Sequence, residues 1–205
     1  MGREVNGLWY NVAMTWKNDQ VSAGETEKIL ELAKEALERE GDFVELGCYK
    51  GDTSLLLAEI LKGTEKKLWI YDSFEGLPEK STKDESVMGK DFKGGELYVT
   101  KREVKERFLR AGLPVPVIKK AWFNELTSSD LPEKISFAFL DGDFYESIRD
   151  SLKLVEDKMV SGGVIIVHDY KNPALPGVER AVLEWNKGRN LKIEAYQSMA
   201  IMRML

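Results

Sequence analysis

Four short segments of this 205-residue sequence place acidic, histidine or glycine residues directly after an apolar run. They are 45–51 (ELGCYKG), 72–78 (DSFEGLP), 141–147 (DGDFYES) and 168–170 (HDY). Carboxylates and an imidazole can bind a metal ion or move a proton, and glycines let a backbone turn close to a ligand. One such segment would be an ordinary turn, whereas four of them after successive apolar runs indicate one site.

The third and fourth segments carry the residues best suited to metal binding. If their strands are neighbours, Asp141, His168 and Asp169 lie within about one strand spacing, roughly 5 Å, of one another. Clustered carboxylates repel unless a positive charge lies between them, and a hard divalent cation is the usual one. Asp143 would reach the same cavity. The structural alternative is a plain turn at 141–143 and a hydrogen-bonded wall residue at His168, the single histidine of the chain.

The first two segments favour a ligand with a ribose. Gly47 and Gly51 let the turn after the first strand pass close to a ligand, and the helix that follows attracts a carboxylate or phosphate at its N-terminus. A tight strand–helix turn is the alternative. The turn matches neither G-x-G-x-x-G nor G-x-x-x-x-G-K-[ST], which counts against a pyrophosphate cofactor. Asp72 stands where an acid accepts hydrogen bonds from a ribose diol, unless it serves only as a turn or cap residue.

The apolar pattern predicts the elements that must position these residues. Strands are predicted at 43–47, 68–71, 115–118, 135–140 and 163–167, and helices at 22–40 (opened by a capping box), 52–61, 96–111, 148–159 and 177–187. Residues 191–196 and 199–204 are expected to form a closing antiparallel pair. Near-continuous apolar strands between helices indicate a parallel sheet covered on both faces, in which ligands bind at the carboxyl ends of the strands.

Composition narrows the class of protein. The chain has 43% apolar and 32% charged residues and no repeat or linker, so we expect one domain over 1–205. Thirty Lys and Arg against 35 Asp and Glu give a net charge of −5, which argues against a nucleic-acid partner. No apolar run reaches the length of a membrane span, and residues 1–20 lack a signal-peptide pattern. The single cysteine, Cys48, excludes an internal disulfide framework, and we expect a cytoplasmic protein with no membrane partner.

Two segments outside the alternating pattern are candidates for covering the cleft. Residues 1–41 are predicted to form an N-terminal cap segment and a helix. In this segment Trp9, Tyr10 and Trp16 would cap the substrate cleft, form a subunit interface or pack on the core. Residues 74–95, rich in Gly, Lys and Ser, are long for a connection in a compact domain and are predicted to form a lid loop.

Six motifs, in order along the chain, resemble those of the macrocin-type O-methyltransferases. They are 43–54 (FVELGCYKGDTS), 72–78, 122–125 (WFNE), 135–147 (ISFAFLDGDFYES), 162–170 (GGVIIVHDY) and 175–178 (LPGV). The region that contains them is roughly two-thirds of the chain, from about Asp42 to Ala181. The block at 135–147 is long, and it is the most specific of the matches.

The resemblance implies a Rossmann-like class I methyltransferase fold, with a mostly parallel seven-stranded sheet, helices on both faces and a C-terminal antiparallel strand. It implies S-adenosylmethionine as cofactor, Mg²⁺ as the divalent metal, and a hydroxyl of a small sugar-like or natural-product-like molecule as acceptor. The implied cofactor-binding residues are Glu45, Gly47, Cys48, Ser54, Asp72 (on the ribose), Ser73, Ala121 and Trp122 (near the adenine), and Asp141. The implied metal ligands are Asp141, His168 and Asp169, and the implied catalytic residues are Asp141 and Asp143, the latter as general base.

The sequence departs from the family pattern in three places. His168 stands where the family has an acid, and histidine favours softer ions than Mg²⁺, so the identity of the metal is left open. Ala121 stands where a glycine is expected. The chain is also shorter before Asp42 than natural-product members of the family, in a region that holds parts of substrate pockets and subunit contacts. The acceptor and a homo-oligomeric state therefore do not carry over.

O-methylation fits the chemistry of these residues. A hydroxyl is a poor nucleophile until it loses its proton, a metal on Asp141, Asp169 and His168 would lower its pKa, and Asp143 would take the proton. Three alternatives stay open: an NAD-type oxidoreductase, a nucleotide-sugar glycosyltransferase that uses 141–143 on a metal, and a non-catalytic S-adenosylmethionine-binding protein. The acceptor could be a sugar, a lipid, a small metabolite or a peptide.

Overall fold

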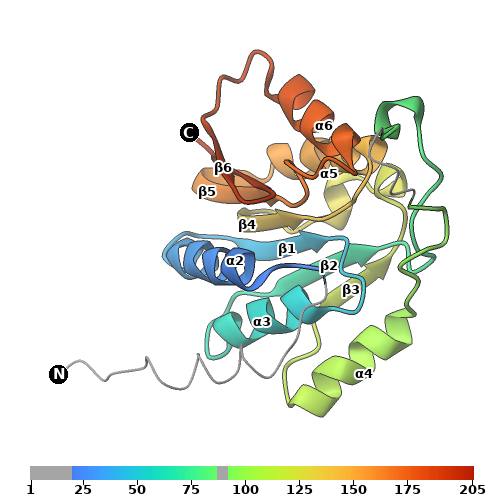
Figure 1. The fold of residues 1–205 in the computed structure, drawn as a ribbon. Coiled ribbons are helices and arrows are strands. Elements are labelled where there is room, and N and C mark those ends of the chain that lie inside the picture. Colours follow the sequence, from blue (N-terminus) through green and yellow to red (C-terminus); the bar gives the residue numbers. More distant parts are fainter. Residues whose placement is uncertain (1–19, 87–91) are drawn as a thin grey trace.

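A seven-stranded sheet forms the centre of the protein in a computed structural model (Figure 1), which describes residues 20–86 and 92–205. The strands are β1 (Asp42–Leu46), β2 (Leu68–Asp72), β3 (Val117–Lys120), β4 (Ile135–Leu140), β5 (Met159–Val167), β6 (Ile193–Tyr196) and β7 (Met199–Arg203). They are arranged in the order β3-β2-β1-β4-β5-β7-β6. Neighbouring strands from β3 to β5 are parallel, and β7 pairs antiparallel with both β5 and β6. The predicted parallel sheet and its closing antiparallel pair are confirmed.

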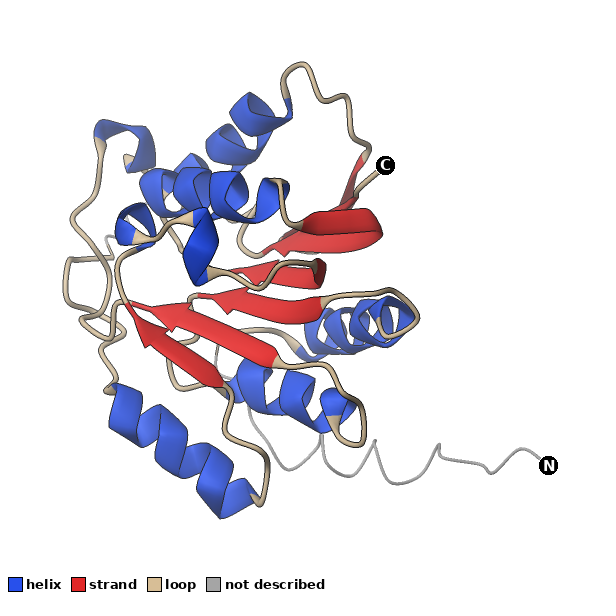
Figure 2. Ribbon diagram, turned by 180° about the vertical axis from the view of Figure 1, so that it is seen from behind, coloured by secondary structure: helices blue, strands red, loops and turns tan. Residues whose placement is uncertain are grey.

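Helices cover both faces of the sheet, because successive strand residues point to opposite sides. The helices are α2 (Ala23–Ala36), α3 (Asp52–Leu61), α4 (Lys101–Ala111), α5 (Tyr145–Glu156) and α6 (Pro176–Asn186). As Figures 1 and 2 show, α2, α3 and α4 lie on one face, and α5 and α6 lie on the other. In β4, Phe137 and Phe139 pack with the first group, and Ala138 and Leu140 pack with the second. Among the described residues, no helix has both the length and the apolar character of a membrane span.

Several predicted boundaries differ from the structure. The first helix ends at Ala36 rather than at 40, and the helix predicted at 148–159 is α5, Tyr145–Glu156. Met159, predicted on that helix, begins β5 instead, four residues before the predicted start of that strand.

The differences in α4 and β3 have local reasons. α4 begins at Lys101 rather than at 96, because Thr100 caps it. The Thr100 side chain accepts a hydrogen bond from the Glu103 N–H, and the Glu103 carboxylate accepts one from the Thr100 N–H at 2.8 Å. β3 begins at Val117 rather than at 115, since Pro116 has no N–H to donate to a neighbouring strand.

The chain changes direction across the sheet between β1 and β4. From β1 it passes through α3 to β2 on one side, and from β4 it passes through α5 to β5 on the other side. In open sheets of this kind, a ligand crevice forms outside the carboxyl ends of the two diverging strands. The four segments singled out in the sequence therefore leave the sheet at one edge.

Parts of the two segments expected to cover the cleft lie outside the described residues. These parts are 1–19, which holds Trp9, Tyr10 and Trp16, and 87–91. The described end of the N-terminal segment is α2, which opens with the predicted capping box. Its Ser22 side chain accepts from the Glu25 N–H at 3.2 Å, and the Glu25 carboxylate accepts from the Ser22 N–H at 3.1 Å.

The described part of the 74–95 loop before the gap is attached to the α5–α6 side of the molecule. It contains a short 3₁₀ helix, Thr82–Asp84, whose last residue is buried. The Asp84 carboxylate accepts a hydrogen bond from the N–H of Tyr145, the first residue of α5, at 2.7 Å. The Ser86 hydroxyl donates to the Pro173 carbonyl at 3.0 Å. A lid role for this loop stays a prediction from the sequence.

The ends of β1 and β4 meet at Gly47. This residue has a φ of +89°, and a Cβ atom there would lie 2.0 Å from the carbonyl oxygen of Asp141. The Asp141 N–H in turn donates to the Leu46 carbonyl at 2.8 Å. Two of the four segments are therefore in direct backbone contact, and this contact by itself requires glycine at position 47.

Replacing Gly47 by alanine should show how much free energy of unfolding is lost when these two strand ends are forced apart. Gly63→Ala is a matched control, because Gly63 has a similar φ of +81° but no atom within 4 Å of the place that a Cβ would take. We expect Gly47→Ala to lower the free energy of unfolding by about 2 kcal/mol more than Gly63→Ala, since only Gly47 faces a backbone atom that cannot rotate away. Urea unfolding of both variants measures this difference, and equal losses would show that the β1–β4 junction relaxes without cost.

Candidate functional site

A cleft that is open to solvent lies at the carboxyl edge of the sheet, between the segments that follow β1, β2, β3, β4 and β5. The predicted site residues that line it are Glu45, Gly47, Cys48, Asp72, Ser73, Trp122, Asp141, Asp143, His168 and Asp169. Two predicted residues are not among the lining residues: Ser54, which donates a hydrogen bond to Glu45 from behind the wall, and Ala121, which precedes Trp122.

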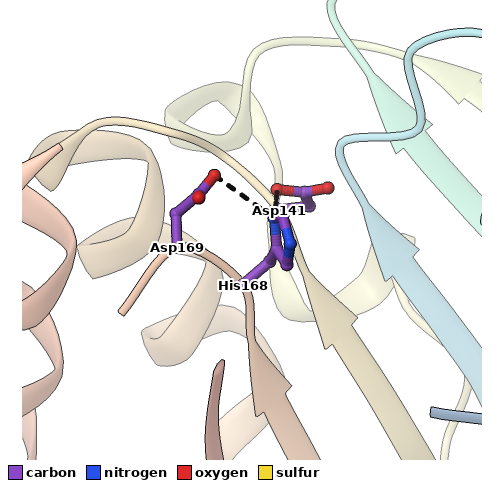
Figure 3. A group of neighbouring side chains, drawn as sticks. All are labelled: Asp141, His168 and Asp169. Carbon is purple, nitrogen blue, oxygen red and sulfur yellow. Dashed lines mark hydrogen bonds and ion pairs between the residues drawn. The ribbon is translucent and has the colours of Figure 1, made fainter. Parts of the chain in front are cut away.

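Asp141, His168 and Asp169 converge where β4 and β5 end, as Figure 3 shows. The two strands are neighbours, with Leu140 paired to Val167, so the residues that follow them are adjacent. The Nδ1 atom of His168 lies 3.1 Å from Asp141 Oδ1 and 3.2 Å from Asp169 Oδ2. The close approach that the sequence indicated for these residues is therefore present, and its central member, His168, is only 4% exposed.

A fourth acidic residue, Glu25 of α2, faces His168 from the other side of the ring. Its Oε2 atom lies 3.8 Å from His168 Nε2. The Glu25 carboxylate also accepts hydrogen bonds from the Ser22 N–H at 3.1 Å and from the Ser198 N–H at 3.0 Å. Sequence analysis identified Glu25 only as a capping-box residue. No local pattern could have placed it in the site, because its neighbours come from the turn between β6 and β7 and from the end of β5.

The charges in this cluster depend on one another. Burial alone would lower the pKa of His168, but the surrounding carboxylates, Asp141 first, raise it well above its ordinary value. Burial alone would raise the pKa of Glu25, but the facing His168 ring and the hydrogen bonds from Ser22 and Ser198 hold that pKa well below its usual range. A buried imidazolium therefore lies among carboxylates at the place where the sequence predicts a metal ion.

Asp143 lies in the same cleft, two residues beyond Asp141 and with a φ of +59°, a conformation that aspartate tolerates better than most residues. Burial, together with the negative charges of Asp141 and Asp169, raises the pKa of Asp143 well above its usual value. A carboxyl group with a raised pKa is suited to exchange protons near neutral pH. The electrostatics are thus compatible with the general-base role that the resemblance implied for Asp143.

Asp72 joins the end of β2 to the turn that follows β1. Its Oδ2 atom accepts hydrogen bonds from the Cys48 N–H at 2.9 Å and the Tyr49 N–H at 3.3 Å, and its Oδ1 atom accepts one from the Phe74 N–H at 2.7 Å. The turn-forming role considered for Asp72 is therefore real. It does not exclude a ligand, because among the described residues Oδ1 accepts a single N–H, which leaves it a second lone pair.

Glu45 is a buried carboxyl in the wall of the cleft, 1% exposed, and it accepts a hydrogen bond from Ser54. Burial raises the pKa of Glu45 to about 8, in spite of that hydrogen bond, and the nearby charges of Asp141 and Asp72 act in the same direction. The group is therefore protonated at neutral pH in the free protein and presents a neutral hydrogen-bonding surface.

Asp141, His168 and Asp169, here called the acid–histidine cluster, have donor atoms that fit a divalent cation. Two ligand atoms at adjacent positions of one ion, each about 2.1 Å from it, stand about 3 Å apart. His168 Nδ1 has this spacing to one oxygen of Asp141 and one of Asp169, and the three donor atoms all lie within 4.8 Å of one another. The same spacing fits a proton on Nδ1. A metal ion would therefore bind in place of that proton, as ligation by a neutral imidazole requires.

Comparison with known proteins agrees with the resemblance found in the sequence. A sequence profile described as Macrocin-O-methyltransferase (TylF) matches residues 9–199. The chain is similar to the 8-demethyl-8-(2,3-dimethoxy-alpha-L-rhamnosyl)-tetracenomycin-C 4'-O-methyltransferase of Streptomyces olivaceus. The identity is 31% over an alignment of 138 residues, which covers 63% of this chain and 53% of the relative. The chain spans about half the length of the curated relatives it matches.

Solved structures share the fold. The O-methyltransferase NovP superimposes with a TM-score of 0.75 at 23% identity, over 87% of this chain and 78% of its own. An O-methyltransferase from Bacillus cereus in complex with SAH (S-adenosylhomocysteine) superimposes with a TM-score of 0.64 at 15% identity, over 96% of this chain and 88% of its own. At these identities the likeness shows the fold alone, which is that of class I methyltransferases.

Glu45→Gln should flatten part of the pH dependence of stability. The folded protein keeps the Glu45 proton up to about pH 8, whereas the unfolded chain loses it near pH 4.5. The stabilisation that the Glu45 proton contributes is therefore fully present below about pH 4.5. It is lost as the pH rises towards 8, by about 1.4 kcal/mol of unfolding free energy per pH unit. Glutamine keeps an acceptor for Ser54 and has no proton to lose. Urea unfolding at pH 5 to 8 should show the variant gaining on the wild type, whereas Glu38→Gln, at an exposed position, should run parallel to it. A Glu45→Gln curve parallel to the wild type would contradict the raised pKa.

Proposed function

The chain belongs to the macrocin-O-methyltransferase family, and on this premise we propose that it is an S-adenosylmethionine-dependent O-methyltransferase. Its acceptor would be a hydroxyl of a small sugar-like or natural-product-like molecule, and residues 1–205 would form one methyltransferase domain. One observation carries the proposal: Glu45, Asp72 and the acid–histidine cluster, from segments that resemble family motifs, line a single cleft at the carboxyl edge of the sheet.

The part of the cleft around β1 and β2 would hold the cofactor. The second lone pair of Asp72 Oδ1 would accept a ribose hydroxyl, and the Trp122 ring would lie near the adenine. The other proposed cofactor-binding residues that line the cleft are Glu45, Gly47, Cys48 and Ser73, together with Asp141 after β4. Ser54 and Ala121 would act from outside the lining, Ser54 through its hydrogen bond to Glu45 and Ala121 by preceding Trp122. An acidic wall suits the positive sulfonium group of S-adenosylmethionine, and the SAH complex of the Bacillus cereus enzyme supports an adenosyl ligand for this fold.

The part around β4 and β5 would carry out the chemistry. Asp141, His168 and Asp169 would hold a divalent cation, which when bound supplies a Lewis acid that lowers the pKa of the acceptor hydroxyl. Asp143 in its carboxylate form would accept the hydroxyl proton. The walls of the cleft would align the acceptor oxygen with the sulfonium methyl group, so that the new C–O bond forms as the C–S bond breaks.

A sugar hydroxyl fits the name of one relative. The name of the Streptomyces olivaceus relative contains a rhamnosyl group, and this supports a sugar hydroxyl as the acceptor. An NAD-type enzyme and a nucleotide-sugar enzyme share this sheet type. The glycine fingerprint of an NAD-type enzyme is missing, and a nucleotide-sugar enzyme that used the short segment 141–143 would not account for the motif at 45–51. A non-catalytic S-adenosylmethionine-binding protein would bind the cofactor without turnover.

Calorimetric titration tests the proposed class directly. We expect S-adenosylmethionine and S-adenosylhomocysteine to bind with dissociation constants in the micromolar range, because the cleft offers an adenosyl ligand both a ribose acceptor and an aromatic wall. NAD and a nucleotide sugar are the controls, and each ligand is measured with and without Mg²⁺. Absence of adenosyl binding by a folded sample would refute the proposal, and binding of a control ligand alone would replace it.

Asp72→Asn should weaken binding of S-adenosylhomocysteine about 10- to 100-fold. Hydrogen bonds to a charged group contribute about 1.5–3 kcal/mol, and the variant loses that charge while keeping one acceptor for the turn. Asp157→Asn, at an exposed position after α5, is the matched control and should bind as the wild type does. Thermal unfolding of both variants checks the fold. Unchanged affinity in Asp72→Asn would remove the ribose role from Asp72.

A further inference from the structure

The buried ring of His168 has one nitrogen, Nε2, without a hydrogen-bond partner among the described residues. The side chain is 4% exposed, so solvent does not supply that partner. The carboxylate that faces Nε2 is that of Glu25, with Oε2 at 3.8 Å. This separation is an ion-pair distance, and a small shift of the ring would turn it into a hydrogen bond.

The position of Glu25 is determined from two sides. In the α2 capping box its Oε2 atom accepts from the Ser22 N–H at 3.1 Å. Its Oε1 atom accepts from both the N–H and the hydroxyl of Ser198, in the turn between β6 and β7. A carboxylate that is 4% exposed and held by these donors cannot turn away from His168. Glu25 therefore offers the imidazole an acceptor in a constant place.

This arrangement determines which nitrogen can bind a metal ion. A neutral imidazole has an N–H on one ring nitrogen and a lone pair on the other, and the lone pair binds the metal ion. When a metal binds, the proton therefore remains on the other nitrogen, where a hydrogen-bond acceptor stabilises it. With Glu25 at Nε2, the lone pair of Nδ1 points towards Asp141 and Asp169, whose oxygens are 3.1 and 3.2 Å away. Metal-binding histidines commonly donate their second N–H to a carboxylate, which sets the tautomer and the ring orientation.

We propose that Glu25 is a positioning residue that holds His168 in its Nε2–H form, so that Nδ1, Asp141 and Asp169 bind a nitrogen-preferring divalent ion such as Co²⁺ more tightly than Mg²⁺. The inference rests on the metal site of the proposed function. The role of Glu25 depends on the histidine of this chain, because an acid at position 168 would have no N–H from which Glu25 could accept a hydrogen bond. An imidazole nitrogen in the ligand set shifts affinity towards transition-series ions.

Metal affinities of the tag-free protein test the proposal. Calorimetry with Co²⁺ and with Mg²⁺ compares the wild type, Glu25→Gln and His168→Asp. We expect Glu25→Gln to weaken Co²⁺ binding about 10- to 100-fold, with a smaller effect on Mg²⁺. His168→Asp should reduce the preference for Co²⁺ over Mg²⁺, because the nitrogen ligand is lost. Adding Glu25→Gln to it should cause no further weakening, since there is no imidazole left to orient.

Glu103→Gln is the matched control for the loss of charge in a capping box. Glu103 occupies in α4 the position that Glu25 occupies in α2, and its carboxylate accepts from the Thr100 N–H at 2.8 Å. This variant should bind both ions as the wild type does. Thermal unfolding of the two glutamine variants separates a general loss of helix stability from an effect on the metal site.

The imidazole itself supplies a readout that a purely structural role of Glu25 would not change. His168 is the single histidine of the 205 residues, so ¹⁵N-histidine labelling reports one ring without assignment. In the Zn²⁺-loaded wild type we expect a protonated Nε2 and a metal-shifted Nδ1, and in Glu25→Gln a weaker preference for this form. Should Glu25→Gln fail to fold, the spectrum of the wild type decides alone.

The outcomes separate this inference from the proposed function. Three outcomes would overturn the role of Glu25. Glu25→Gln could bind Co²⁺ as tightly as the wild type does, the wild type could bind Mg²⁺ more tightly than Co²⁺, or Zn²⁺ could bind Nε2. Absence of binding by any divalent ion would overturn it together with the metal site. S-adenosylhomocysteine binding, measured on the same samples, shows in each case whether the methyltransferase proposal itself survives.

Discussion

Repulsion between carboxylates is the constraint on which the rest of the site depends. Asp141, Asp169 and Glu25 surround one buried imidazole, and Asp143 lies in the same cleft. Such groups can be buried together only if a proton or a cation offsets their charge. The free protein meets this condition with protons, because the pKa values of His168 and Asp143 both lie well above their ordinary values. Any cation that enters the cluster must take over the role of one of these protons.

Backbone contacts hold the cleft in shape without a ligand. The close approach of Gly47 to the Asp141 carbonyl joins the ends of β1 and β4, and the Asp72 carboxylate joins the end of β2 to the Cys48 N–H after β1. Three of the strand ends that carry candidate residues are thereby connected to one another. A cleft built in this way is largely preformed, so the energy of ligand binding is not needed to assemble it.

Family membership accounts for the fold and for the order of the motifs. His168 is a departure from the family pattern, which has an acid at this position. Next to an acid at position 168, the Glu25 carboxylate would add one more negative charge to a crowded site. Next to an imidazole it becomes a favourable partner, at 3.8 Å in the free protein. Histidine at 168 and glutamate at 25 are therefore consistent with each other, although one belongs to the sheet edge and the other to the N-terminal helix.

The sequence by itself determined the elements, the sheet type and the four strand-end segments that meet at the cleft, because apolar periodicity, caps and strand-end residues are local patterns. Its errors at the start of α4 and of β3 were also local: the cap at Thr100 and the missing N–H of Pro116 set those boundaries. Only the tertiary structure decided that Glu25 reaches His168 and that Gly47 touches the Asp141 backbone. These contacts join segments far apart in the chain, and they exist only because β1, β4, β5 and β7 are neighbours in one sheet.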